Sequence, residues 1–207
     1  MPRPVAADYH EKAGQIVAAA GRVFAEKGYE RATMADIARA AGFAKATTYH
    51  YFGSKEAVLY ALLRNSLTDL LTATKQADPG PAADPEQRLV SVIEAYAVAF
   101  VERVSVVTPL LLDLSQLRPE WRLEIRRLER ELLALLAGVI GTLDPALPPR
   151  IAALTVFGAI NWTYYWYNPN GDLSAEALAG GMATLLAGGL TAFSTRRREG
   201  RPLRTPE

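Results

Sequence analysis

Residues 33–56 read TMADIARAAGFAKATTYHYFGSKE, and this stretch decides the fold. Its apolar residues recur at three- and four-residue steps, which predicts two short helices over 34–41 and 45–51. Thr33 is typical of a residue that caps a helix start, and Gly42 permits the turn that follows a helix end. Two short helices joined by a tight turn predict a helix-turn-helix, a unit that proteins place in the major groove of DNA.

Helical periodicity continues on both sides of this stretch, and no segment keeps the two-residue alternation of a strand. The clearest break is DPGPAADP (78–85), because residues that precede proline avoid the helical conformation. We therefore predict an all-α protein of about nine helices, with a three-helix DNA-binding domain over 1–56. A larger helical domain for ligand binding and dimerisation is expected over 57–195, followed by a basic, disordered tail over 196–207. The remaining helices are expected at 8–27, 54–75, 86–104, 108–117, 119–142, 149–167 and 174–195.

The composition is that of a globular protein, with 50% hydrophobic and 22% charged residues. The absence of cysteine excludes a disulfide framework, and the first residues lack the apolar core of a secretory signal, so we expect a cytoplasmic protein. The net charge of +1 is unevenly distributed: residues 1–64 carry +3, residues 65–195 carry −5 and residues 196–207 carry +3. A basic N-terminal part on an acidic body indicates that the N-terminal part meets a polyanion.

The second short helix carries the side chains that we expect to contact DNA. Hydroxyls and short side chains suit base edges in the major groove, whereas lysine, tyrosine and histidine suit phosphates. Helix starts at Thr33 and Ser54 offer backbone N–H groups that bind phosphate oxygens. The alternative is an ordinary small bundle, in which Tyr49 packs in the core and the polar residues form a solvated face. The predicted DNA contacts are Thr33, Lys45, Ala46, Thr47, Thr48, Tyr49, His50, Tyr51, Ser54 and Lys55.

Four segments keep a fixed order and spacing: FAEKGY (24–29), TMADIA (33–38), AGFAKATTYHYF (41–52) and SKE (54–56). Together they resemble the tetracycline-repressor (TetR) family of bacterial regulators. Ala44 stands where that family often has a capping serine, and Thr48 where it often has an aliphatic residue. The resemblance implies a homodimer with two recognition helices in successive major grooves of a palindromic double-stranded operator. It also implies a C-terminal domain that binds a small effector and thereby releases the DNA.

Residues 151–171 and 177–195 carry no charged side chain, so we expect both segments to be enclosed. The second contains four mid-helix glycines, each of which costs about 1 kcal/mol relative to alanine unless a close helix contact offsets it. We expect both segments to form a homodimer interface, as the family resemblance also implies. Two membrane spans are the alternative, which the asparagines of the first and the small residues of the second disfavour. The expected interface residues are Trp162, Tyr165, Gly181, Leu185 and Gly188.

An effector pocket is expected within the helical body, where aromatic and apolar residues recur at helical spacing. Ordinary core packing is the alternative for each of them. Arg118, Arg122, Arg126 and Arg130 recur every four residues, which is typical of a solvated helix face or, alternatively, of an anion-binding rim suited to acyl-coenzyme A phosphates. The candidate ligand-binding residues are Tyr96, Phe100, Leu111, Leu114, Arg118, Trp121, Arg122, Ile125, Phe157, Asn161, Trp162 and Trp166.

A further segment, NWTYYWYNPNGDLS (161–174), is similar to the C-terminal signature of TetR subgroups that regulate the degradation of fatty acids, phenylacetate or steroids. Members of those subgroups respond to acyl-CoA thioesters. The resemblance therefore implies an acyl-CoA effector, and it does not identify the acyl chain.

The chain lacks the usual motifs of catalysis. Its only histidines, His10 and His50, lie in the N-terminal part, and there is no phosphate-binding glycine loop or nucleophile elbow. We therefore expect no enzymatic activity, no cofactor and no metal. The sequence predicts a ligand-responsive, sequence-specific repressor, and an activator or a ligand-blind regulator on the same fold is the alternative.

Overall fold

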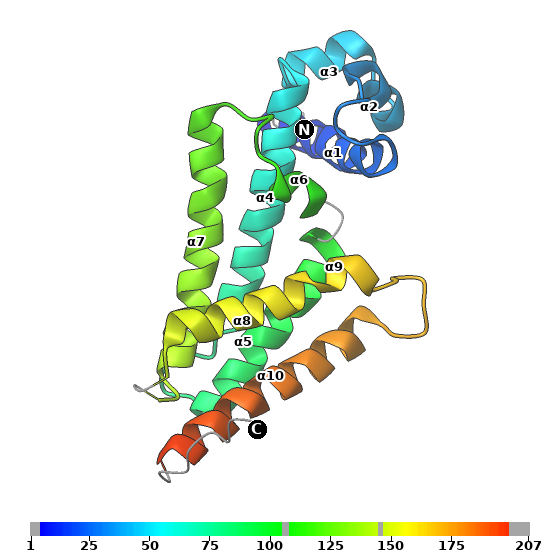
Figure 1. The fold of residues 1–207 in the computed structure, drawn as a ribbon. Coiled ribbons are helices and arrows are strands. Elements are labelled where there is room, and N and C mark those ends of the chain that lie inside the picture. The colour runs from blue at the N-terminus through cyan, green and yellow to red at the C-terminus, as the bar shows by residue number, and fades with distance from the viewer. Residues whose placement is uncertain (1–4, 105–107, 145–146, 199–207) are drawn as a thin grey trace. The chain divides into compact units, whose positions relative to one another are not determined.

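The computed structural model describes residues 5–104, 108–144 and 147–198, and every regular element among them is a helix (Figure 1). The predicted all-α fold is confirmed. Of the expected tail, residues 196–198 end the last helix, and 199–207 lie outside the described residues. The chain forms two compact units, one of residues 1–67 and 106–126 and the other of residues 68–105 and 127–207.

The first unit begins with α1 (Val5–Lys27), α2 (Met34–Ala41), α3 (Lys45–Tyr51) and the first turns of α4 (Lys55–Gln76) (Figure 1). α2 contacts both α1 and α3. Each fully buried aliphatic or aromatic side chain contributes about 1.5–3 kcal/mol to stability. The buried apolar residues of this core include Ile16, Ala20, Val23, Phe24, Ile37, Ala38, Val58 and Leu59.

The same unit contains α6 (Thr108–Leu112) and the start of α7 (Pro119–Gly141). The helix expected over 108–117 stops after one turn, because the Asp113 carboxylate accepts the backbone N–H of Ser115 at 2.9 Å. A side chain that bonds its own backbone two residues on favours a turn over a helix.

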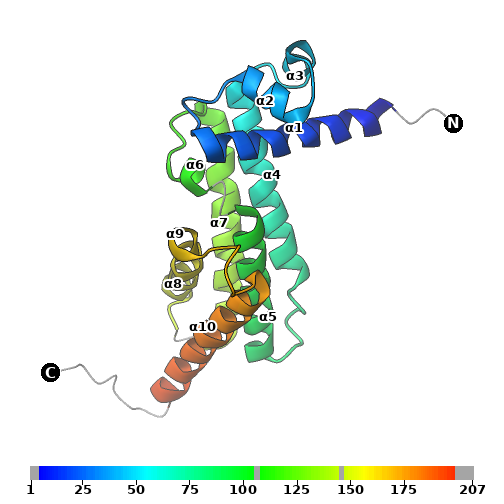
Figure 2. The same cartoon turned by 90° about the vertical axis from the view of Figure 1, so that its right-hand side faces the viewer.

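The second unit contains α5 (Pro85–Ala99), its five-residue π-helical continuation η1 (Phe100–Val104), α8 (Pro149–Asn161), α9 (Thr163–Trp166) and α10 (Ala175–Arg198). α5 and α10 pack side by side (Figure 2). The helix expected over 149–167 is interrupted at Trp162, and the hydroxyl of Thr163 donates to the Ile160 carbonyl at 2.7 Å just beyond α8. Such a bond competes with the helical ladder and favours a break.

The proline-rich segment before α5 is held by an ion pair. The Arg88 guanidinium donates to both carboxylate oxygens of Asp78, at 2.6 and 2.8 Å, and this contact lowers the pKa of the Asp78 carboxyl. Asp84 then caps α5 by accepting the backbone N–H groups of Glu86 and Gln87. The predicted break at 78–85 is therefore an ordered turn with its own side-chain contacts.

Candidate DNA interface, ligand site and dimer surface

The turn between α2 and α3 has the geometry that the sequence predicts. The Thr33 hydroxyl accepts the Asp36 backbone N–H, and the Asp36 carboxylate accepts the Thr33 backbone N–H, both at 3.1 Å, which completes a capping box. Gly42 ends α2 with a φ of 74°. An added Cβ at Gly42 would meet nothing within 4 Å, so it is the left-handed backbone, and not crowding, that favours glycine there.

α3 presents a polar face to solvent. Lys45, Ala46 and His50 are exposed, and Tyr49 is 43% exposed. The Lys45 ammonium lies 5.8 Å from the centroid of the Tyr49 ring, so these two side chains share the face. Thr47 is half-buried beside them. This group contains the predicted DNA contacts that are accessible to a duplex.

Tyr51 closes the C-terminal end of α3. It is half-buried, and its ring packs against that of Tyr9 in α1 with centroids 4.6 Å apart. Ser54, in the next turn of chain, accepts the backbone N–H of Ala57 and caps α4, as predicted. Both residues therefore fix the ends of helices, and Ser54 uses its side-chain oxygen in doing so.

Two predicted DNA contacts already bond groups of the same domain. Thr48 is fully buried, and its hydroxyl donates to the Ala44 carbonyl at 3.3 Å, so it faces the core. Thr33 gives both its N–H and its hydroxyl to Asp36, whose charge occupies the start of α2. A phosphate there would meet the Asp36 carboxylate, which repels it.

Lys55 also bonds within the domain. Its ammonium donates to the backbone carbonyls of Tyr29, Glu30 and Ala32, at 2.8, 3.3 and 3.0 Å, and lies 4.2 Å from the centroid of the Tyr29 ring. Lys55 therefore ties the loop between α1 and α2 to α4 instead of reaching toward DNA. The pattern SKE after the recognition helix contains no signal for this internal role.

Lys55→Met therefore tests whether Lys55 stabilises the folded domain, and Lys45→Met tests whether Lys45 contacts DNA. Loss of the charge-assisted hydrogen bonds of Lys55 is expected to cost about 1.5–3 kcal/mol of folding free energy. Lys45→Met is expected to leave the melting temperature unchanged and to reduce the slope of log K against log salt concentration by about one unit for each phosphate that Lys45 neutralises. Thermal unfolding and salt titration of DNA binding measure the two effects. The assignment is wrong if Lys55→Met changes the salt slope and not the stability.

Asp36 predicts a pH dependence of stability. Hydrogen bonds from Lys27 and Thr33 lower the pKa of its carboxyl from 3.8 to about 2. Because the folded-state pKa lies below the unfolded one, ionised Asp36 stabilises the fold above about pH 4, and this contribution disappears as the pH falls toward 2. The free energy of unfolding of the wild type should therefore exceed that of Asp36→Asn most at pH 7. Urea unfolding at pH 7, 4 and 3 measures the gap, and a gap that stays constant contradicts the assignment.

The predicted ligand-binding residues divide between the two units. In the second unit Tyr96 is fully buried, donates its hydroxyl to Asn161 at 2.6 Å and stacks on Phe157 with ring centroids 5.8 Å apart. Burial raises the pKa of the Tyr96 hydroxyl well above 10, so it is a hydrogen-bond donor. Phe100 is buried next to Tyr96 at the start of η1, with ring centroids 6.2 Å apart. These four residues form one contiguous aromatic and polar cluster.

Of the other predicted ligand-binding residues, Trp162 and Trp166 lie in the second unit and the rest lie in the first. Leu111, Leu114 and Ile125 are buried, whereas Trp121 and Arg122 are half-buried. Arg118 pairs with Glu56 of α4. Trp162 and Trp166 of the second unit are 60% and 52% exposed, so in the single chain their rings face solvent.

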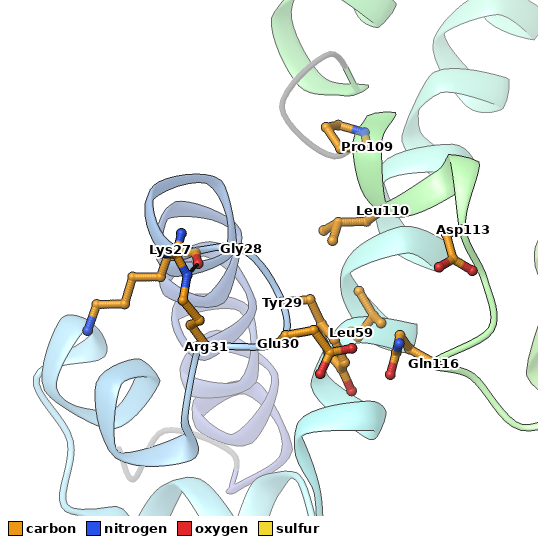
Figure 3. Close-up of a pocket in the computed structure, with 10 residues that line it drawn as sticks. All are labelled: Lys27, Gly28, Tyr29, Glu30, Arg31, Leu59, Pro109, Leu110, Asp113 and Gln116. Atoms are coloured by element: carbon orange, nitrogen blue, oxygen red, sulfur yellow. Dashed lines mark hydrogen bonds between the residues drawn. The ribbon is translucent and has the colours of Figure 1, made fainter.

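The first unit also contains a cavity of about 290 Å³ that no sequence pattern predicted (Figure 3). It lies beside the turn after α1 and the segment around α6, and residues of both polar and apolar kinds line it. Gly28, which has a φ of 75°, follows the last residue of α1 and lines the cavity. The lining residues are Lys27, Gly28, Tyr29, Glu30, Arg31, Leu59, Pro109, Leu110, Asp113 and Gln116.

The residues predicted for the dimer interface are exposed in the single chain. Trp162 and Tyr165 are each 60% exposed and pack on one another with ring centroids 4.4 Å apart, and Leu185 is 77% exposed. An added side chain at Gly181 or Gly188 would meet nothing within 4 Å. α9, with Trp162 at its start, and α10 thus leave apolar side chains and small residues uncovered, a surface of the kind that helix partners use.

α10 is also the one helix in the described residues that is long and apolar enough to cross a membrane, over Ala175–Arg196. Only 28% of that window is buried. An uncovered helix of this composition is also what an interface with a second copy requires.

Two family models match the chain. The model of bacterial regulatory proteins of the tetR family matches residues 16–62, and the model of the tetracyclin repressor-like C-terminal domain matches residues 82–190. The fatty acid metabolism regulator protein of Bacillus subtilis is 29% identical to this chain, over 85% of this chain and 94% of that protein.

Solved structures agree with this relationship. The TetR family transcriptional regulator PfmR from Thermus thermophilus matches with a TM-score of 0.76 and 31% identity, over 84% of this chain and 97% of that one. AibR, solved in complex with isovaleryl coenzyme A and operator DNA, matches with a TM-score of 0.71 and 25% identity, over 84% and 97%. The two family models together span both the helix-turn-helix and the C-terminal helices. The chain therefore belongs to the TetR family of bacterial regulatory proteins.

Proposed function

We propose that this protein is a homodimeric repressor that binds a palindromic operator and leaves it when an acyl-CoA thioester binds. The observation that carries the proposal is the exposed face of α3, which offers Lys45, Thr47, Tyr49 and His50 directly after a capped helix and a glycine turn. The basic charge of residues 1–64 supports contact with DNA. Thr33, Thr48 and Lys55 bond within the domain, and Tyr51 and Ser54 fix helix ends. The proposed DNA contacts are the remaining five residues of α3, Lys45, Ala46, Thr47, Tyr49 and His50.

Dimerisation supplies the second recognition helix. The uncovered surface of α9 and α10, with Trp162 at the start of α9, Tyr165, Gly181, Leu185 and Gly188, is the proposed interface. We place the DNA-binding domain over 1–56 and the ligand-binding and dimerisation domain over 57–195. A repressor of this type acts on chromosomal DNA in the cytoplasm, and recovery of the protein only in the membrane fraction would contradict this.

The effector class rests on the segment 161–174 and on two relatives. One is named a fatty acid metabolism regulator, and the other was solved with isovaleryl coenzyme A. The Tyr96–Asn161 pair adds a buried polar contact in an apolar surrounding, which is typical of ligand sites that fix one polar group of an otherwise apolar molecule. We infer that the acyl chain enters the body near this pair.

The test is a gel shift with DNA upstream of the protein's own gene, carried out with acyl-CoAs of several chain lengths. Coenzyme A and the free fatty acids are the matched controls. Release by at least one thioester, and by neither control at the same concentration, is the expected result. Activation of transcription without release would indicate an activator, indifference to every thioester would indicate another effector or none, and steady thioester hydrolysis would indicate an enzyme.

A further inference from the structure

Three pairs of side chains join the first turns of α4 to the start of α7 inside the first unit. Glu56, Tyr60 and Arg64 recur every four residues on α4, and they meet Arg118, Trp121 and Glu124 in turn. This row of contacts, here named the latch, begins at Glu56 in the first turn of α4. Only residues 52–54 separate that turn from the recognition helix, so the latch holds the C-terminal end of α3.

Glu56 and Arg118 form the first pair of the latch. The Glu56 carboxylate accepts the Arg118 backbone N–H at 2.7 Å and two guanidinium N–H groups, from Nε at 3.2 Å and Nη2 at 3.1 Å. This contact lowers the pKa of the Glu56 carboxyl. A guanidinium fork that holds a carboxylate in two-point geometry also fits a phosphate.

Aromatic rings keep the Arg118 guanidinium in place independently of Glu56. Its central carbon lies 3.8 Å from the centroid of the Trp121 ring, and Trp121 stacks on Tyr60 at 4.6 Å and 9°. Tyr60 in turn donates its hydroxyl to Glu124, which also pairs with Arg64. The cation is therefore already positioned to receive another anion if Glu56 leaves.

The pair can be reached and exchanged from solvent. The Arg118 side chain is 45% exposed and that of Glu56 is 26% exposed. Ion pairs at such exposure are weak, so an anion of higher charge can compete with the internal carboxylate. Arg122, one turn further along α7, is half-buried and has no ion-pair partner among the described residues, so it adds a second cation beside the first.

We propose that Arg118 is an exchangeable anion site: Glu56 occupies it in the ligand-free protein, and a phosphate of the effector displaces Glu56 there. The displacement frees the first turn of α4 and, with it, the C-terminal end of the recognition helix. This inference rests on the proposed function for the class of the effector, a molecule that carries phosphates, and it concerns contacts within the first unit alone. Octanoyl-CoA carries phosphates and octanoate carries only a carboxylate, so octanoate is the control that lacks the proposed anion.

The test compares Glu56→Gln, Arg118→Gln and the wild type by two measurements. Calorimetry measures binding of octanoyl-CoA and octanoate to the DNA-free protein, and fluorescence anisotropy measures operator affinity with and without each probe. Glu56→Gln should bind octanoyl-CoA about tenfold more tightly, because the hydrogen-bonded internal competitor is gone and only Glu120, with its Oε1 3.8 Å from the Arg118 Nε, remains. The same variant should bind the operator several-fold more weakly. Arg118→Gln should lose about tenfold or more in probe affinity and most of the probe's effect on DNA.

A matched control and a folding check accompany these variants. Arg127→Gln removes another exposed arginine of α7, which pairs with Glu131 at 2.7 Å, and should change neither measurement. Circular dichroism melting shows whether Arg118→Gln is folded, and a tightening of probe binding in Glu56→Gln cannot arise from loss of structure. The inference is overturned if Glu56→Gln binds the probe no more tightly than the wild type, or if folded Arg118→Gln responds like the wild type.

Failure of the proposed function gives a different result. If octanoyl-CoA and the other thioesters leave wild-type operator binding unchanged, the proposed effector class fails, and the anion site is then judged with pyrophosphate. Pyrophosphate is titrated into the DNA-free wild type and into Glu56→Gln, and it should quench tryptophan fluorescence at a lower concentration in the variant. Trp121→Phe should remove this change in fluorescence. No quenching in either protein overturns the anion site itself.

Discussion

Leu185→Glu is expected to convert the protein to a monomer and to reduce operator affinity by about 100-fold or more, because a monomer engages one half-site without the benefit of a linked second half-site. Leu185 is 77% exposed on α10, so the change removes little packing within the single chain. In the proposed interface, however, it places a charge opposite apolar residues of the second copy, where burial without a partner is costly. Light scattering after gel filtration measures the mass, and anisotropy measures the affinity.

Leu123→Glu is the matched control for this experiment. Leu123 is 66% exposed on α7, outside the proposed interface, and its replacement should leave the dimer intact. Gly188→Leu provides a second approach, since the single chain has space for the side chain and a closely packed partner helix does not. If both interface variants remain dimeric, the interface lies elsewhere on the molecule.

The double variant Thr47→Ala/Tyr49→Ala is expected to lose specific operator binding while its melting temperature stays within a few degrees of the wild type. Each good contact to a base is worth about 1–3 kcal/mol, so removing two of them corresponds to about 30-fold or more in affinity. Binding to unrelated DNA should change little, because phosphate contacts supply that part of the affinity. Competition anisotropy with operator and unrelated DNA measures both.

Thr48→Val is the internal control on the same helix. Thr48 is fully buried and its hydroxyl bonds the Ala44 carbonyl of its own turn, so valine should leave operator affinity within about threefold of the wild type. Loss of binding in Thr48→Val, with retention in the double variant, would reverse the assignment of the two faces of α3.

The sequence predicted the helix-turn-helix almost to the residue, because its signals are local. Thr33 and Gly42 mark the ends of α2 through backbone geometry that neighbouring residues determine. The breaks after Leu112 and at Trp162 were not predicted, although Asp113 and Thr163 bond nearby backbone groups there. Such side chains favour either a turn or a helix according to their tertiary surroundings.

The candidate site was harder to predict because it depends on partners far apart in the sequence. A lysine at position 55 looks equally suited to a phosphate and to three carbonyls of a distant loop. The periodic arginines of α7 hinted at an anion site, yet nothing in the pattern indicated that Glu56 already occupies Arg118. The cation could therefore be found from the sequence, whereas its internal carboxylate could not.

The inward direction of Thr48 affects how this regulator and its targets change over evolutionary time. On the seven-residue helix α3, packing constrains one side, while the opposite side is open to solvent within the described part of the chain. On the proposed DNA contacts, substitutions at exposed Ala46 redirect the protein to a new promoter at little cost in stability, and those at half-buried Thr47 do so within the limits of its packing. A duplicated gene could acquire a separate regulon through changes at these positions alone, and the same positions are the ones to randomise when a new promoter specificity is selected in the laboratory.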